Sequence, residues 1–159
     1  MVNDNIIAFY YIIIMLAYHI LIPVLSAMAM NGIMYTFHLN KRYTHKSSLL
    51  PPGYIIGIVW TIIFAFLGYV HYLLYSLHNQ TNYGSASVVL FILYSLAYPL
   101  INAMHAKYGY FLNLISLILS FVLGLIVITY SKHIFLFMIP LLVWVSFVNL
   151  VILYSLLDS

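Results

Sequence analysis

Five long stretches of this chain contain no aspartate, glutamate, lysine or arginine, and each is long enough to cross a membrane as a helix. They are residues 6–30, 52–77, 88–105, 110–130 and 134–157. In hydrocarbon every backbone N–H and C=O must find an internal partner, so a spanning chain forms helices or a closed barrel. Barrel strands alternate apolar and polar residues, and these stretches show no such alternation. The chain is therefore expected to be an all-α integral membrane protein.

The composition excludes a water-soluble fold. Apolar residues make up 66% of the chain and charged residues 4%, which is too few to cover a soluble surface.

The breaks after residues 105 and 130 are short, so the last three helices must be antiparallel neighbours. The first stretch is too long for the core of a cleaved signal peptide, so it counts as a retained helix. We expect residues 1–159 to form one domain, a single bundle of five transmembrane helices.

Basic residues predict the orientation of the bundle. The first loop contains Lys41, Arg42 and Lys46. The third loop, on the same side, adds Lys107, whereas the other side has only Lys132. By the positive-inside rule the basic loops and the C-terminus face the cytoplasm, and the N-terminus lies on the non-cytoplasmic side. A sequon at 79–81 would then be non-cytoplasmic, as a glycosylation site or as a chance match.

What the helices lack excludes several classes of function. Both acidic residues, Asp4 and Asp158, lie near the termini, so an ion pathway through the membrane is not expected. Without cysteine or an intramembrane acid, thiol and triad chemistry are excluded as well. No two histidines are three or four residues apart, so no metal site is expected on one helix. His19, well inside the first helix, is interpreted as an imidazole bonded to a neighbour.

Polar and small residues within the helices are interpreted mainly as packing contacts. Hydrogen bonds between helices are favoured over ligand contacts for three asparagines, Asn102, Asn113 and Asn149. Small residues recur on one face of the fourth helix at Ser116, Ser120 and Gly124. A GxxxG pattern opens the second helix at Gly53 and Gly57. Both patterns are typical of close helix packing, within the bundle or in a dimer.

The two tryptophans lie at nearly the same expected depth. At 1.5 Å per residue, Trp60 lies roughly 13 Å from one face, and Trp144 lies roughly 15 Å from the other. In a hydrocarbon core about 30 Å thick, both indoles are close to the midplane. Tryptophan ordinarily prefers the membrane interface. The pattern fits one internal cavity lined by both rings, or two unrelated packing residues, and geometry alone favours neither.

The segment around Trp60 resembles the second helix of the translocator protein family, which includes the bacterial tryptophan-rich sensory proteins and the peripheral-type benzodiazepine receptor. The residues that match the family pattern there are Pro51, Pro52, Gly57, Val59, Trp60, Thr61, Phe64 and Gly68. The matching residues in the fifth helix are Pro140, Trp144 and Phe147. In the third helix Pro99 matches, with Ser95 and Tyr98 where the family has asparagine and tryptophan. Helix count and the long first loop also agree, so the resemblance covers the whole chain.

Two parts of the chain depart from the family pattern. The family's first loop usually ends Lys-Pro-Ser-Trp, whereas here Ser47 and Leu49 replace the proline and the tryptophan. The loop that closes over bound ligand is therefore altered. A sterol motif described in vertebrate members needs a basic residue after its tyrosine, and none follows Tyr154. The sterol motif is therefore incomplete.

The resemblance implies a tetrapyrrole-binding protein, with porphyrin or haem as ligand rather than as a required cofactor, and a stress-related regulatory or transport role. Members in animals also bind cholesterol, so the resemblance implies sterol as a further partner within the lipid bilayer. A second copy of the chain is the partner that the small-residue patterns allow. The residues that it assigns to the ligand site are Trp60, Trp144, Tyr54, Tyr98, Phe147, Pro51, Pro52, Gly57, Ser95 and Lys46. The indoles would stack on the porphyrin ring, and Lys46 at the cavity mouth would pair with a carboxylate.

Two alternatives stay open. Some members of the family support light- and oxygen-dependent breakdown of protoporphyrin, and in such an enzyme Trp60 and Trp144 would be catalytic. A membrane scaffold, by contrast, would need no ligand cavity. Nucleic acid is not an expected partner. The membrane would be the mitochondrial outer membrane in a eukaryote and a cell-envelope membrane in a bacterium.

Overall fold

The computed structural model describes residues 4–39, 50–78, 82–104 and 108–157. Its first four long helices are α1 (Asp4–Thr36), α2 (Gly53–His78), α3 (Tyr83–Met104) and α4 (Gly109–Tyr130). The fifth membrane-length segment consists of α5 (Lys132–Phe135), the 3₁₀ turn η3 (Leu136–Met138) and α6 (Ile139–Leu157). All five are long and apolar enough to cross a membrane, and the described residues contain no strand. The predicted all-α fold with five spans is confirmed, and the chain is a multi-pass integral membrane protein.

Helix α3 begins at Tyr83, ahead of the Val88 expected from hydropathy. Asn82 caps this end of the helix, because its Oδ1 accepts a hydrogen bond from the Ser85 backbone N–H at 2.9 Å. The Ser85 hydroxyl oxygen accepts in return from the Asn82 backbone N–H at 3.0 Å. Such a reciprocal pair satisfies N–H groups that the first helical turn cannot satisfy itself. The cap therefore lets α3 begin within a run of polar residues that hydropathy assigns to a loop.

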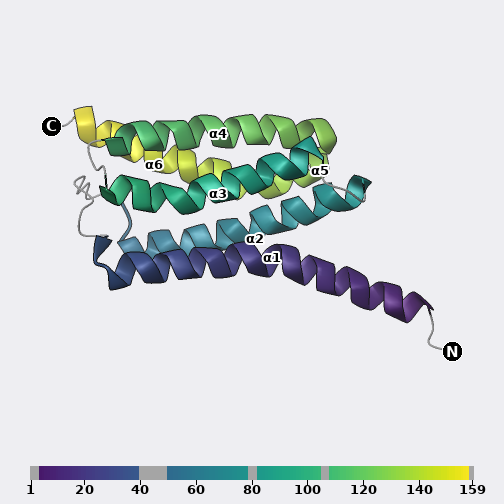
Figure 1. Ribbon diagram of the computed structural model, residues 1–159. Coiled ribbons are helices and arrows are strands. Elements are labelled where there is room, and N and C mark those ends of the chain that lie inside the picture. Colours follow the sequence, from purple (N-terminus) through teal and green to yellow (C-terminus); the bar gives the residue numbers. More distant parts are fainter. Residues whose placement is uncertain (1–3, 40–49, 79–81, 105–107, 158–159) are drawn as a thin grey trace.

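The helices form a bundle in which α1 pairs with α2, and α3 contacts both α2 and α4 (Figure 1). Helix α4 packs against α6, and α2 also contacts α5 and η3. The start of α1 and the end of α6 lie at opposite ends of the bundle (Figure 1). The N-terminal part of α1 diverges from its neighbours, and residues 6–14 are all exposed. The 33 residues of α1 span about 50 Å, which is longer than the hydrocarbon core.

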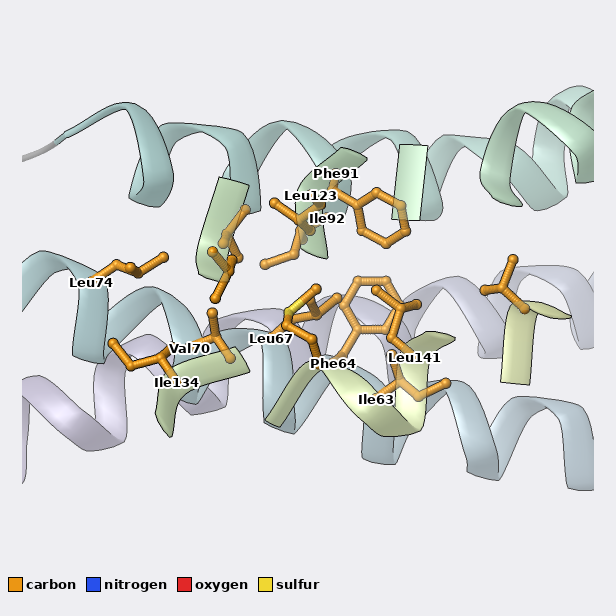
Figure 2. Close-up of a cluster of buried hydrophobic side chains, with 14 of the residues drawn as sticks. Ile63, Phe64, Leu67, Val70, Leu74, Phe91, Ile92, Leu123, Ile134 and Leu141 are labelled. Atoms are coloured by element: carbon orange, nitrogen blue, oxygen red, sulfur yellow. The ribbon is translucent and has the colours of Figure 1, made fainter. Parts of the chain in front are cut away.

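The apolar core of the bundle is built on one face of α2 (Figure 2). Its buried side chains recur every three or four residues, as expected for one helix face, and are Ile63, Phe64, Leu67, Val70 and Leu74. They meet Phe91 and Ile92 of α3, Leu123 of α4, and Ile134 and Leu141 of the fifth span. Lipid is as apolar as these side chains, so close packing is what favours helix association here.

Gly68 allows α1 and α2 to approach closely. A Cβ atom at this position would overlap the backbone oxygen of His19 and would lie 2.9 Å from the Ile20 Cα. At Gly57 a Cβ would meet only the side chain of Asn31, at 3.2 Å. At Gly53 it would meet nothing within 4 Å among the described residues, so Gly53 makes no close contact within the bundle, and its alternative role in a dimer stays a prediction. The tight contact between the two backbones depends on Gly68.

Polar side chains join α3, α4 and α6. Asn149 Nδ2 on α6 donates to the Asn113 backbone oxygen on α4 at 3.2 Å. The Tyr98 hydroxyl on α3 donates to Asn113 Oδ1 at 2.9 Å. Nearby, the hydroxyls of Tyr94 and Ser116 lie 3.1 Å apart between α3 and α4. The interpretation of Asn113 and Asn149 as contacts between helices is confirmed.

Candidate functional site

Trp144 lies on α6 with its ring packed against the apolar core. Its ring centroid is 5.8 Å from that of Phe147, with 34° between the ring planes. The indole Nε1 is buried and has no hydrogen-bond partner among the described residues. A buried donor left unpaired costs roughly 1–3 kcal/mol, and a buried tryptophan N–H usually has an acceptor. Trp144 is therefore a buried donor that a ligand could satisfy.

Trp60 approaches the same core from α2. The half-buried ring packs against Phe64, with a centroid distance of 6.0 Å and an interplanar angle of 48°. Trp60 and Trp144 both contact the buried cluster that contains Leu67 and Leu141. The two indoles therefore border one apolar region from two different helices.

Helix α3 adds a second buried polar atom without a partner. Ser95 is 8% exposed, and its Oγ has no hydrogen-bond partner among the described residues. Serines in membrane helices commonly donate to a carbonyl one turn earlier. Ser116 and Ser120 do so here, at 3.1 and 2.8 Å. Ser95 differs from them in having an unpaired hydroxyl, whereas Tyr98 one turn later bonds to Asn113.

The residues expected at the mouth of the site lie at the start of α2. The Pro52 carbonyl accepts from the backbone N–H groups of residues 55 and 56 at 2.9 and 3.2 Å, so the double proline, Pro51 and Pro52, leads directly into the helix. Tyr54 is 71% exposed, so its ring lies on the outside of the bundle. The Gly57 carbonyl accepts from Thr61 Oγ1 at 2.9 Å and from Asn31 Nδ2 at 3.3 Å, which links it to α1. Lys46 lies outside the described residues.

The described surface carries apolar hollows away from the tryptophans. One of about 480 Å³ runs along α6, and its lining includes Phe147 and Tyr154. Another, of about 200 Å³, lies between α3 and α4 and is lined in part by Tyr94. The residues that line these two hollows do not include Trp60 or Trp144. A ligand in contact with both indoles would therefore lie outside these two hollows.

His19 is bonded to a neighbour, as predicted, and this neighbour is His71 of α2, which the sequence analysis did not identify. The Nδ1 atoms of His19 and His71 lie 2.7 Å apart. Spacing rules within one helix cannot detect such a pair. The available signal was depth, because each histidine lies about 26 Å along its helix from the loop that joins α1 to α2. No group of three or more potential metal ligands occurs in the part of the chain that the structure describes.

A model of the TspO/MBR family matches residues 7–156, which is nearly the whole chain. The matched range includes both tryptophans, Ser95 and the two paired histidines. Neither the comparison with curated proteins nor that with solved structures gave a match. The family match agrees with the resemblance carried by the segment from Pro51 to Gly68.

Proposed function

Because this chain belongs to the TspO/MBR family, we propose that it binds a tetrapyrrole, either a porphyrin or haem, inside the membrane between α2, α3 and α6. Its role would be a stress-related regulatory or transport one. The observation that carries this proposal is the pair of unsatisfied polar atoms, Trp144 Nε1 and Ser95 Oγ, among the described residues. Both belong to the residues that the family pattern assigns to the ligand.

The chemistry of a tetrapyrrole suits this combination of groups. Its ring is flat and largely apolar, and the indoles of Trp60 and Trp144 offer faces on which such a ring stacks. The face of its ring offers weak acceptors, which an unpaired indole N–H and serine hydroxyl both require deep in the membrane. A bilayer supplies no water in their place. The carboxyl groups at the membrane surface would pair with Lys46 in the first loop.

We place the entrance at the end of the bundle where α2 begins. Farther along α2, Phe137 of η3 holds this helix to the fifth span. Its ring centroid is 4.9 Å from that of Tyr69 and 6.3 Å from that of Phe66. Trp60 lies about 9 Å nearer the helix start than Phe66. Separation of the helices at this end would expose the two indoles and leave the aromatic contact at Phe137 intact.

The test uses the two tryptophans as separate reporters. In Trp60→Phe the tryptophan fluorescence comes from Trp144 alone, and in Trp144→Phe it comes from Trp60 alone. Protoporphyrin titrated into the purified protein should quench both variants. Replacing either indole with alanine should weaken binding several-fold to about tenfold, since a lost stacking face is worth roughly 1 kcal/mol. Phe121→Ala is the control, because this aromatic residue is 50% exposed on α4 and should bind as the unaltered chain does.

Unchanged affinity in both alanine variants would exclude the proposed site. Ser95→Ala should weaken binding as well, because it removes one of the two donors. Illumination of the complex then separates binding from degradation. A new product that forms with the unaltered chain and is lost in Trp60→Phe would assign a photo-oxidative enzyme. Absence of any saturable quenching would favour a scaffold.

A further inference from the structure

A second site lies where α1 packs against α2. His19 and His71 face each other with their Nδ1 atoms 2.7 Å apart, their ring centroids 4.5 Å apart and their planes at 61°. His19 is 7% exposed, and its Nε2 is buried without a hydrogen-bond partner among the described residues. Gly68 holds the backbone of α2 against that of His19, so the two rings are brought together by close helix packing.

A hydrogen bond is one arrangement that satisfies the two Nδ1 atoms. One ring must carry a proton on Nδ1 while the other offers a lone pair there. A metal ion shared by the pair would instead use the Nδ1 lone pair of both rings. We propose that His19 and His71 together bind a Cu²⁺ ion through their two Nδ1 atoms. This site is separate from the proposed tetrapyrrole site, because His71 lies about 16 Å beyond Trp60 along α2.

The two nitrogens lie close enough to bind one ion after a small movement. With metal–nitrogen bonds of about 2.0–2.1 Å, two neighbouring ligands of a square-planar ion lie roughly 2.9 Å apart, whereas two ligands of a tetrahedral ion lie roughly 3.3 Å apart. The observed 2.7 Å is a hydrogen-bond length, so the nitrogens would separate by roughly 0.2 Å to bind a square-planar ion and by roughly 0.6 Å to bind a tetrahedral one. Among divalent ions Cu²⁺ prefers this geometry and binds nitrogen ligands most tightly. Two histidines in cis therefore fit copper better than zinc.

Metal binding would also fix the tautomer of each ring. When Nδ1 binds the ion, Nε2 carries the proton and needs an acceptor. Around His19 the rings of Tyr72 and Tyr75 have centroids 5.8 and 5.4 Å away, and aromatic faces are weak acceptors for an N–H. No further histidine or acid joins the pair among the described residues, so water would fill the remaining positions. His71 lies about 10 Å from the end of α2, and His71 and both tyrosines are only half-buried.

The test first isolates the pair. In a variant in which every histidine except His19 and His71 is alanine, Cu²⁺ titrated into the purified protein should bind one ion per chain. Its electron paramagnetic resonance spectrum should show splitting from two nitrogen ligands. Replacing His71 with asparagine should weaken this binding by about tenfold or more, because one of two protein ligands is lost. His71 is chosen because it is half-buried and therefore easier to replace than His19.

The same change in the otherwise unaltered chain provides an independent measurement. His71→Asn should remove one bound copper, and it should abolish the rise in unfolding temperature that copper causes by linking α1 to α2. His133→Ala, which changes an exposed histidine outside the pair, should keep that rise. Failure of the two-histidine protein to bind copper overturns the proposal. The proposal is also overturned if His71→Asn leaves both the copper affinity and the copper-induced stabilisation unchanged.

Discussion

Replacing Gly68 with alanine should destabilise the protein by about 1–2 kcal/mol. The new Cβ would overlap the His19 backbone oxygen and would lie 2.9 Å from the Ile20 Cα. Backbone atoms cannot rotate away as a flexible side chain can, so α1 must shift by roughly 1 Å to restore an ordinary separation. Overpacking costs about 1–3 kcal/mol, and an overlap with backbone belongs to the upper part of that range, about 2–3 kcal/mol. The better helix propensity of alanine offsets about 1 kcal/mol, which leaves about 1–2 kcal/mol.

Gly32→Ala is the matched control for this prediction. Gly32 also lies within a helix, but a Cβ there would meet nothing within 4 Å among the described residues. Alanine at position 32 should therefore leave stability unchanged or raise it slightly. Unfolding in a denaturing detergent, followed by circular dichroism, would measure both variants. If Gly68→Ala were as stable as the unaltered protein, the close contact between α1 and α2 inferred from the structure would be refuted.

Two further predictions concern the helix contacts and the topology. Asn113→Leu and Tyr98→Phe should each destabilise the bundle, because the two side chains share one hydrogen bond between helices. A double-mutant cycle should therefore give a coupling energy of about 0.6 kcal/mol. Strictly additive effects of the two changes on stability would contradict this prediction. A cysteine introduced at Ser47 should be labelled from the cytoplasmic side of the membrane, and one introduced at Asn82 from the opposite side. The reverse pattern of labelling would contradict the orientation expected from the basic loops.

The number and type of helices could be predicted from the sequence because the solvent dictates them. A backbone in hydrocarbon must satisfy its own hydrogen bonds, so uncharged apolar stretches of sufficient length have to be helices. Local signals were also informative. The second uncharged stretch was expected to begin at residue 52, and α2 begins at Gly53. At α3 the signal was the polar pair of Asn82 and Ser85, which a hydropathy pattern alone assigns to a loop.

Only the tertiary structure decided which face of each helix points inward. In a water-soluble protein the polar face marks the outside, but in a bilayer both faces are apolar, and the pattern loses this information. Tyr54 is therefore exposed whereas Tyr98 bonds within the bundle, although the sequence placed both at the ligand. The pairing of His19 with His71 likewise depends on the register of two helices, which the contact at Gly68 sets. Contacts between helices are properties of that packing, and no spacing within one helix encodes them.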